Sequence, residues 1–422
     1  MDVALRKAGP LDCTFVAPPS KSYTHRALVA AALADGESLV LDPLVSDDTE
    51  VTWRALESMG ISIEGVENGL VVHGRGGTLS CPGGLVIDAG ESGTSMRLLC
   101  SVALLCGRPV TLTGSRRMKE RPIGPLAAAI RALGGEAEFL GAEGYPPVRV
   151  SGTIAGGDVW VDAGMSSQFV SSILLVAPLA RSDVSVMTGG SVASPSYIDV
   201  TISVMESFSA RVERDGYRKF RVPAGRRYRP ARYRVEGDYS SASYFFALAA
   251  LCGGRVVVRN LNPNSCQGDR AFLACLERMG CTVKSGTDWV EVSSDGDLEG
   301  IDVDMTSSPD TVQTLCVVAS RARGPTRISG VGHLRYKESD RLAETARLLS
   351  GLGAGAAVEG DSITIVPGPM HGGEIDPGSD HRTAMSFATL GLATGNLKIR
   401  NAECVSKSFP GFWEQLSMQG LV

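Results

Sequence analysis

Residues 51–65, VTWRALESMGISIEG, carry a pattern that recurs along the chain and decides how it is organised. Apolar residues repeat at helical spacing up to Met59, Gly60 follows, and an alternating run typical of a short strand comes next. The pattern predicts an amphipathic helix that stops at a glycine and leads into a strand. Related stretches occupy residues 126–139, 200–213, 271–284 and 342–358, with a truncated copy at 412–420. The six copies close at Gly60, Gly134, Ala210, Gly280, Gly353 and Gly420, at intervals of 67 to 76 residues.

A second repeated unit alternates with the first and predicts a different kind of helix. Each copy has a small polar start and then a run that is apolar on nearly every side, as in residues 92–107, SGTSMRLLCSVALLCG. A helix without a polar face is expected to be buried. Strand-like runs such as RVVVRNL, residues 255–261, follow these helices. The copies start near Ser20, Gly93, Ser166, Ser240, Ser308 and Asp380. Alternating strands and helices of this kind predict an α/β fold.

The polar starts of these buried helices predict a site for anions. A helix N-terminus offers unpaired N–H groups and a partial positive charge, so it favours a negatively charged ligand. If pseudo-symmetry arranges the six units in two groups of three, the starts converge on a cleft between two domains. Ordinary capping explains any single polar start. Six polar helix N-termini that recur at the same interval favour a site for a polyanionic ligand.

Composition sets limits on the class of protein. The 422 residues suffice for two domains, and the formal net charge of −5 argues against a nucleic-acid partner. Ten cysteines without a CxxC pair and five scattered histidines predict no metal site. Free thiols suit a reducing cytosol. No secretion signal opens the chain and no apolar run reaches about 18 residues, so we expect a cytoplasmic protein that does not enter a membrane.

Residues 18–28, PPSKSYTHRAL, place cations where a helix dipole disfavours them. The stretch predicts the start of a helix that closes on Gly36. Lys21, His25 and Arg26 lie in its first turns, and a cation there costs about 0.3–1 kcal/mol. An anion bound near Lys21 and Arg26 explains this placement, whereas His25 is interpreted as a structural residue of the helix.

Three further clusters mix Arg and Lys with acidic residues. They are GSRRMKERPIG at 114–124, LRYKESDRL at 334–342 and DHRTAM at 380–385. A charge run is usually a solvated surface, but this mixture also serves to orient guanidinium groups and to move protons. Asp310, at a helix start, is either a plain cap or a general base kept ionised by nearby cations. The candidate anion-binding cations are Arg26, Arg97, Arg121, Arg341 and Arg382, with Lys21, Lys337 and Lys407.

The motifs just described, taken in order, resemble a known family. PPSKSYTHRAL, SGTSMR, RMKERPIG, SSQF, SPSYIDVT, VEGDYSSASYF, KESDR, DHRTAM and SKSFPGFWEQL all match. They resemble the 5-enolpyruvylshikimate-3-phosphate synthase family, the enolpyruvyl transferases of the shikimate pathway. The resemblance covers nearly the whole chain and includes every charged cluster.

This resemblance implies a specific architecture. Two similar domains are each built from three βαβαββ repeats around buried helices, an inside-out α/β barrel, with the active site in the interdomain cleft. The chain crosses between domains twice, near residues 18–20 and 236–238. Residues 1–17 together with 238–422 then form the C-terminal domain, and residues 18–237 form the N-terminal domain.

The resemblance also implies the reaction. The enolpyruvyl group of phosphoenolpyruvate passes to the 5-hydroxyl of shikimate 3-phosphate through a tetrahedral intermediate, and phosphate is released. This is the sixth step of the pathway to chorismate and the aromatic amino acids. Neither a metal nor an organic cofactor is implied, and the expected partners are the two small-molecule substrates. We expect a monomer with no nucleic-acid or membrane partner.

Site residues follow from the resemblance at the matching positions of this sequence. Shikimate 3-phosphate is expected at Lys21, Ser22, Arg26, Ser166, Ser167, Gln168, Ser194, Tyr197, Asp310, His333 and Lys337. Phosphoenolpyruvate is expected at Lys21, Gly93, Arg121, Gln168, Arg341, Arg382 and Lys407. Asp310 matches the base that acts on the 5-hydroxyl. Glu338 and Lys21 are the candidates for proton transfer at C3, and the sequence does not assign the individual steps.

Two positions depart from the family pattern. Glu91 and His333 stand where Asn is common. A carboxylate beside an anion site repels the ligand unless it pairs with a cation such as Arg121 or turns away, so both changes bear on affinity more than on the type of reaction. Gly93 leaves room for a compact phosphonate, from which we expect sensitivity to glyphosate in competition with phosphoenolpyruvate.

Three alternatives are weaker. The UDP-N-acetylglucosamine enolpyruvyl transferases share fold and donor but place a Cys in the loop that corresponds to RMKERPIG, which contains none. A nucleic-acid end-processing protein of related fold is disfavoured by the net charge of −5. An anion-binding protein without catalysis has no need of Asp310, Lys337 and Glu338 together.

Overall fold

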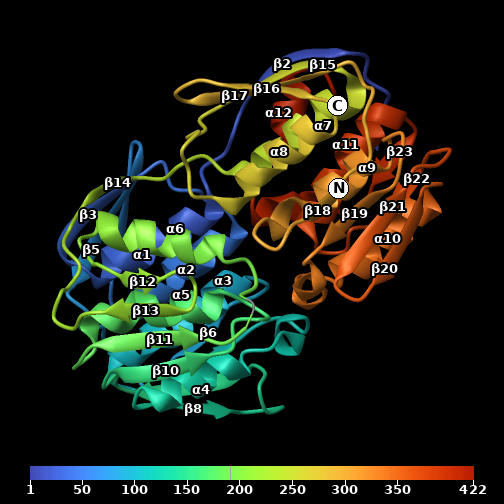
Figure 1. Cartoon of the computed structure of the whole chain (residues 1–422). Helices are drawn as coiled ribbons and strands as arrows, with labels where there is room; N and C mark the ends of the chain where they lie inside the picture. Colours follow the sequence, from blue (N-terminus) through green and yellow to red (C-terminus); the bar gives the residue numbers. More distant parts are fainter. Residues whose placement is uncertain (191) are drawn as a thin grey trace. The chain divides into compact units, whose positions relative to one another are not determined.

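The computed structural model describes residues 1–190 and 192–422, which form two compact units (Figure 1). The N-terminal unit is Pro19–Val235, and the C-terminal unit joins Met1–Pro18 to Glu236–Val422. Each unit has its own cluster of buried apolar side chains. The N-terminal segment of the chain therefore contributes to the core of the C-terminal unit.

The N-terminal unit has buried helices inside and sheets outside. Its buried helices are α1 (Lys21–Leu33), α3 (Gly93–Val102) and α5 (Gln168–Val176). Its amphipathic helices are α2 (Asp47–Ser58), α4 (Gly124–Ala132) and α6 (Ser196–Ser207). Its strands are β3 (Asp35–Leu41), β4 (Ser62–Val66), β5 (Gly69–Arg75), β6 (Val86–Asp88), β7 (Val110–Thr113), β8 (Gly135–Phe139), β9 (Val148–Gly152), β10 (Gly157–Val161), β11 (Val184–Thr188), β12 (Glu213–Asp215), β13 (Lys219–Val222) and β14 (Arg232–Arg234).

The C-terminal unit repeats this arrangement. Its buried helices are α7 (Tyr239–Cys252), α9 (Val312–Ala319) and α11 (His381–Thr394). Its other helices are α8 (Ala271–Arg278), α10 (Arg341–Gly351) and α12 (Phe412–Met418). Its strands are β1 (Val3–Leu5), β2 (Leu11–Val16), β15 (Gly254–Arg259), β16 (Thr282–Ser285), β17 (Trp289–Ser294), β18 (Asp302–Asp304), β19 (Thr326–Ser329), β20 (Gly355–Glu359), β21 (Ser362–Val366), β22 (Gly373–Ile375) and β23 (Leu397–Ile399).

One repeat is seen most clearly in the run β6–α3–β7–α4–β8–β9. The sheet order is β6-β7-β9-β8: β6 pairs parallel with β7, and the other pairings are antiparallel. The parallel pair needs a crossover, which the buried helix α3 supplies. The orders β10-β11-β13-β12 and β18-β19-β21-β20 are equivalent. The α/β class and the repeated unit predicted from the sequence are thus confirmed, and the sheets stay separate rather than closing into a barrel.

Strands from distant parts of the chain complete three of the sheets. In the N-terminal unit β14 pairs parallel with β3, although almost 200 residues separate them in sequence. In the C-terminal unit β2 pairs parallel with β15, and β1 pairs antiparallel with β23. The sheet β1-β23-β22 has no hairpin after its helix, which agrees with the truncated sixth copy at the end of the chain.

Small hydroxyl side chains lie where the buried helices touch. Ser101 of α3 lies 2.7 Å from Ser172 of α5, oxygen to oxygen. In the C-terminal unit Thr314 of α9 lies 3.3 Å from both Ser243 of α7 and Ser386 of α11. A buried hydroxyl needs a hydrogen-bond partner, and these contacts provide one while keeping the helices close.

Two helix ends differ from the sequence prediction. Helix α1 ends at Leu33, and Gly36 (φ 123°) lies inside β3, because Ala34 already has extended backbone. After α6 the left-handed residue is Ser209 (φ 67°), so the closing position predicted at Ala210 was wrong by one residue. The other five closing positions are glycines with positive φ, at Gly60, Gly134, Gly280, Gly353 and Gly420.

Replacing Phe15 with Ala should destabilise the C-terminal unit alone. The Phe15 ring is buried and stacks on Phe245 with centroids 4.0 Å apart, and its loss should cost about 3–5 kcal/mol. Hydrogen exchange read by mass spectrometry should show faster exchange in peptides of the C-terminal unit. Val16→Ala, on the same strand but half exposed, is the control. Equal acceleration in both units would contradict the division into separate cores.

Candidate active site

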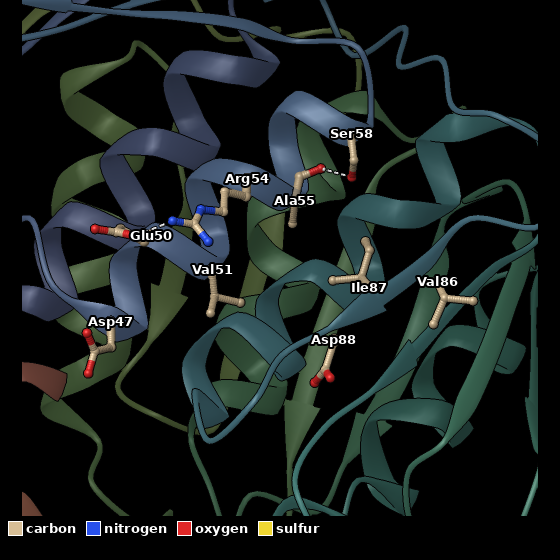
Figure 2. A pocket seen from close by; sticks show the side chains of 9 residues that line it. All are labelled: Asp47, Glu50, Val51, Arg54, Ala55, Ser58, Val86, Ile87 and Asp88. Atoms are coloured by element: carbon tan, nitrogen blue, oxygen red, sulfur yellow. Dashed lines mark hydrogen bonds and ion pairs between the residues drawn. The ribbon is translucent and has the colours of Figure 1, made fainter. Parts of the chain in front are cut away.

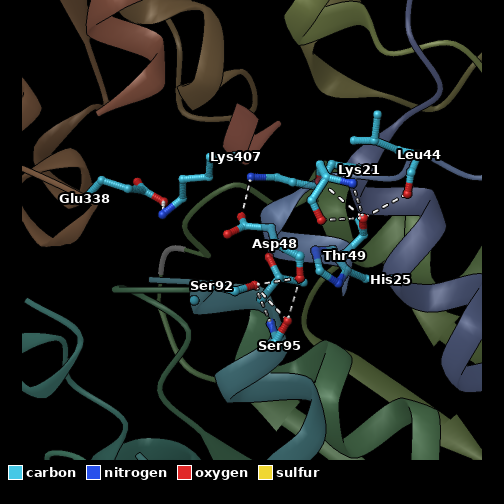
Figure 3. A network of polar contacts seen from close by, with 12 residues as sticks. Lys21, His25, Leu44, Asp48, Thr49, Ser92, Ser95, Glu338 and Lys407 are labelled. Carbon is cyan, nitrogen blue, oxygen red and sulfur yellow. Dashed lines mark hydrogen bonds and ion pairs between the residues drawn. The ribbon is translucent and has the colours of Figure 1, made fainter. Parts of the chain in front are cut away.

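At the start of α1, Lys21 is held by an acidic residue of the next helix. Its Nζ donates to Oδ2 of Asp48 at 2.8 Å, and both side chains are largely buried (Figure 3). Asp48 lies in the first turn of α2, where a carboxylate is favoured by the helix dipole. The cation that opposes the dipole of α1 is therefore offset by a carboxylate at the start of α2.

Beneath this pair, a buried network of hydroxyl groups ties together the starts of three helices. Nδ1 of His25 lies 2.8 Å from Oγ1 of Thr52, which lies 2.8 Å from Oγ of Ser95. Ser95 in turn contacts Ser92 at 2.7 Å, oxygen to oxygen (Figure 3). Burial foremost lowers the pKa of His25 to about 3, with Lys21 contributing. His25 is therefore neutral at physiological pH and joins α1 to α2.

Arg26 connects α1 to α6. Its Nε donates to Oγ1 of Thr201 at 2.7 Å, and its Nη2 donates to the carbonyl of Tyr197 at 3.3 Å. The guanidinium also lies 6.0 Å from the centre of the Tyr197 ring. Its Nη1 donates to the carbonyl of Ser22 at 2.9 Å. The structure thus brings together three residues that the sequence assigned to one substrate: Ser22, Arg26 and Tyr197.

The start of α3 is a glycine because a guanidinium lies against it. A Cβ on Gly93 would be only 2.5 Å from Nη2 of Arg121, whose side chain is buried. Arg121 follows the short 3-10 helix η2 (Met118–Glu120) of the RMKERPIG motif. Any side chain at position 93 would therefore displace Arg121. The position of this predicted binding cation thus requires a glycine at residue 93.

Gln168 links the starts of α3 and α5. Its Oε1 accepts from Nη1 of Arg97 at 3.0 Å, and its Nε2 donates to Oγ1 of Thr94 at 3.0 Å. Nη1 of Arg97 also donates to the carbonyl of Gly93 at 3.3 Å. The remaining predicted residues of this unit, which lie at the starts of α5 and α6, are Ser166, Ser167 and Ser194. Ser194 has a left-handed backbone, φ 55°.

In the C-terminal unit, a buried guanidinium binds three carboxylates. Nε of Arg341 donates to Asp380 at 2.9 Å, Nη1 to Asp310 at 3.2 Å, and Nη2 to Glu338 at 2.8 Å and to Asp380 at 3.3 Å. The Arg341 side chain is 2% exposed. Burial alone would lower its pKa, but the three carboxylates outweigh burial and raise it, so Arg341 stays charged.

Asp310 binds two arginines rather than capping a helix. Its second oxygen accepts from Nη2 of Arg382 at 2.7 Å, and Nη1 of Arg382 donates to Tyr244 and to the carbonyl of Asp310, each at 3.2 Å. Asp310 lies in the 3-10 helix η5 (Pro309–Thr311), and its oxygens face Arg341 and Arg382. The carboxylate of Asp310 therefore lies between two guanidinium groups.

Glu338 lies between two predicted binding cations. Its Oε2 accepts from Arg341, and its Oε1 lies 3.7 Å from Nζ of Lys407, a pair also drawn in Figure 3. Lys407 ends the 3-10 helix η7 (Ala402–Lys407) and is almost fully buried.

His333 and Lys337 flank the turn before this cluster. His333 lies in the 3-10 helix η6 (Gly332–Tyr336), and Lys337 follows it. Burial first, and then Lys337, lower the pKa of His333 to about 3. The imidazole is therefore neutral at physiological pH, and it differs from the Asn of the family pattern in shape rather than in charge.

Three acidic residues that lie near the predicted site residues were not among the residues predicted from the sequence: Asp48, Asp269 and Asp380. Asp48 lies in the first turn of a helix, a common position for a carboxylate, and Asp380 was named only as a helix start and as part of a charged cluster. Asp269 gave no signal, yet it is fully buried and its Oδ2 accepts from Oγ of Ser240 at 2.7 Å. Burial, and then the neighbouring Asp310, raise the pKa of Asp269 to about 7. Only the tertiary arrangement shows that these acids face cations or one another.

A pocket of about 400 Å³ on the N-terminal unit contains none of the predicted site residues. It is lined by part of α2 and by β6, with Asp47, Glu50 and Asp88 around an apolar floor (Figure 2). Arg54 lies in the same pocket and pairs with Glu50 at 2.7 Å. Three carboxylates to one cation make it unsuitable for a polyanion.

Among residues 1–190 and 192–422, no three His, Cys, Asp or Glu side chains are grouped to hold a metal ion. No helix in that part is long and apolar enough to span a bilayer.

Comparison with known proteins gives a consistent result. The family described as EPSP synthase (3-phosphoshikimate 1-carboxyvinyltransferase) matches residues 5–416. The chain is 57% identical over 422 residues to a 3-phosphoshikimate 1-carboxyvinyltransferase of Methanoculleus marisnigri, with 100% of both sequences covered. It is 54% identical over 424 residues to the one of Methanosphaerula palustris, again with full coverage.

Solved structures agree with the sequence relatives. An EPSP synthase from Acinetobacter baumannii superposes with a TM-score of 0.83 at 29% identity, covering 100% of this chain and 98% of that one. This likeness extends over both units, and it confirms the fold expected from the repeats.

Replacing Asp269 with Asn should remove a pH dependence of folding. In the folded protein Asp269 keeps its proton up to about pH 7, whereas in the unfolded chain it releases it near pH 4. The wild type therefore loses stability as the pH rises from about 4 to 7. At about 1.4 kcal/mol per pH unit, the loss between pH 5 and pH 7 is about 3 kcal/mol.

Urea unfolding at pH 5 and pH 8 tests this effect. The free energy of unfolding of the Asp269→Asn variant minus that of the wild type should be more favourable to the variant at pH 8 than at pH 5. Asp295→Asn, at an exposed aspartate of the same unit, is the control and should follow the wild type. Parallel pH profiles for the wild type and Asp269→Asn would contradict the raised pKa.

Proposed function

This chain belongs to the EPSP synthase family, and on that basis we propose that it transfers the enolpyruvyl group of phosphoenolpyruvate to the 5-hydroxyl of shikimate 3-phosphate, with release of phosphate. The observation that carries the proposal is the full-length identity of 57% with a relative named for this activity. The paired cations and carboxylates at the starts of the buried helices support it, because both substrates are polyanions.

The reaction needs one proton removed from the substrate hydroxyl and one proton moved to and from carbon. The 5-hydroxyl oxygen forms a bond to C2 while C3 takes a proton. The tetrahedral intermediate then loses phosphate from C2 and a proton from C3, which restores the double bond. Charge neutralisation around the phosphates and carboxylates lowers the barrier, and fixed orientation of both substrates lowers it further.

We assign the removal of the hydroxyl proton to Asp310. The guanidinium groups of Arg341 and Arg382 keep its carboxylate ionised, which is the form that accepts a proton. Because each carboxylate oxygen already faces an arginine, binding of an anionic substrate to those arginines would weaken these contacts and raise the basicity of Asp310.

We assign the binding of phosphoenolpyruvate to cations that form ion pairs with carboxylates in this structure. Arg341 and Lys407 both contact Glu338. An incoming anion competes with Glu338 for these donors. Release of Glu338 from Arg341 and Lys407 would then leave its carboxyl group available for proton transfer at C3, with Lys21 as the second candidate. The other proposed phosphoenolpyruvate residues are Gly93, Arg121, Gln168 and Arg382.

We assign shikimate 3-phosphate to hydroxyl groups and cations of both units. Ser22, Arg26 and Tyr197 form one connected group. Ser166, Ser167, Ser194 and Gln168 lie at neighbouring helix starts, where N–H groups favour phosphate. Lys21, His333, Lys337 and Asp310 complete the set.

Further expectations accompany this function. We propose that the two units act as two domains of one enzyme and that neither is active without the other. The expectations of a cytoplasmic monomer, of no cofactor, and of competition between glyphosate and phosphoenolpyruvate stay predictions. Glu91 bears on the affinity for phosphoenolpyruvate, because it lies two residues before Gly93, one of the residues proposed to bind this substrate.

Phosphate release from phosphoenolpyruvate tests the function directly. Release should require shikimate 3-phosphate, and one phosphate should appear for each enolpyruvyl product detected by mass spectrometry. UDP-N-acetylglucosamine should not replace shikimate 3-phosphate as acceptor. Release that proceeds equally well without shikimate 3-phosphate would sink the assignment.

Asp310→Asn should lower kcat by about 10²–10⁴-fold, the range for loss of a general base. Asn has nearly the same shape and can still accept one hydrogen bond from an arginine, so binding of shikimate 3-phosphate should change little. The measurement is kcat by the phosphate assay together with a dissociation constant from calorimetry. A variant with unchanged kcat would remove Asp310 from the role of base.

A further inference from the structure

Residues 211–234, here called the basic segment, have a charge opposite to that of the rest of the chain. The segment reads RVERDGYRKFRVPAGRRYRPARYR and holds ten of the 41 Lys and Arg but only two of the 46 Asp and Glu. Its formal net charge is +8, whereas the remaining residues carry −13. The net charge of −5 is therefore the sum of a strongly basic segment and an acidic remainder of the chain.

The strands of the basic segment turn their cations outward. On β13, Lys219 and Arg221 are exposed while Phe220 and Val222 are buried. On β14, Arg232 and Arg234 are exposed on either side of a half-buried residue. Alternate residues of a strand point to opposite faces. The two cations on each strand therefore lie on the same, solvent-exposed face of that strand.

The stretch between β13 and β14 is fixed to the unit, and it also exposes cations. The hydroxyl of Tyr228 donates to the carbonyl of Leu175 at 2.9 Å. The N–H of Arg229 donates to the carbonyl of Phe208 at 2.9 Å. Arg226 and Arg227 are exposed in this stretch, so exposed cations occur on β13, on β14 and in the connection between them.

Local acids neutralise only part of this charge. Arg214, Arg218, Arg221 and Arg234 each pair with an aspartate. For the other six cations no ion pair is found in residues 1–190 and 192–422; they are Arg211, Lys219, Arg226, Arg227, Arg229 and Arg232. An exposed cluster of this size is a high-potential surface that attracts polyanions.

We propose that the basic segment binds the phosphate backbone of a nucleic-acid duplex. Six cations without ion pairs along an ordered path suit a ligand with regularly spaced phosphates, and such contacts supply most of the affinity of non-specific duplex binding. The activity proposed above makes no use of this surface. The prediction of no nucleic-acid partner rested on net charge, which hides a local surplus of this kind.

The tyrosines of the segment favour a duplex over a single strand. Single-stranded nucleic acids are bound by stacking of bases on exposed aromatic rings. Tyr228 is buried, Tyr233 packs on Phe208 with ring centres 5.7 Å apart, and Tyr217 bonds to Asp199 through its hydroxyl. The three tyrosines thus make contacts within the protein, whereas the arginines of the segment are exposed to solvent.

Fluorescence anisotropy with a labelled 30-base-pair DNA duplex tests the proposal on the full chain. With six phosphate contacts, the logarithm of the binding constant should fall with the logarithm of salt concentration with a slope of about −5. Affinity should then drop about a thousandfold between 50 and 200 mM NaCl. The combined variant Arg226→Gln, Arg227→Gln, Arg229→Gln and Arg232→Gln should reduce the slope to about −2.

The matched control removes the same charge elsewhere. It combines Arg75→Gln, Arg108→Gln, Arg181→Gln and Arg259→Gln, all exposed and outside the basic segment, and should keep a slope near that of the wild type. Both variants should retain wild-type enolpyruvyl transfer, which reports correct folding. The proposal is overturned if the wild type does not bind the duplex at 50 mM NaCl, or if the control loses as much affinity as the segment variant. Segment-dependent binding of polyglutamate or of anionic vesicles, without binding of the duplex, also overturns it.

Discussion

The structure depends on the burial of helices that are apolar on every side. Such a helix cannot lie at a surface without exposing apolar area, so sheets and amphipathic helices have to surround it. In each unit three of these helices sit inside, and small residues with paired hydroxyl groups let them approach one another. The repeated strand–helix unit is the smallest segment that supplies one buried helix and part of its cover.

Burial of the helices also explains why charges gather at their starts. The first N–H groups of a buried helix need partners, and the polar and charged residues found there cannot stay buried without compensation. Arg341 illustrates the solution, because four of its N–H groups are bound by three carboxylates. Such a cluster is stable only while its charges are balanced. An incoming anion can take the place of a carboxylate, so the same charges that stabilise the unit are suited to bind polyanionic substrates.

The predictability of the site varied with the type of residue. Cations at helix starts break the usual preference of the helix dipole, so Lys21, Arg26 and Arg382 stood out in the sequence. Acids at helix starts obey that preference, so Asp48 was not singled out and Asp380 was named only as a helix start and cluster member, although both bind the cations. Asp269 could not be predicted from the sequence for a different reason: its raised pKa arises from burial beside Asp310, which is forty-one residues away in sequence.

The sequence by itself determined the α/β class, the six repeats, the burial of the helices and the family, because these follow from local periodicity and from motifs. Tertiary structure decided what completes each sheet: β14 joins β3, and β1 and β2 join strands far along the chain. It also decided where α1 and α6 end, since Gly36 entered a strand and Ser209 took the left-handed position assigned to Ala210. Pairing between distant strands and between helix starts depends on contacts that no local pattern encodes, and the partners of the buried charges are set by those contacts.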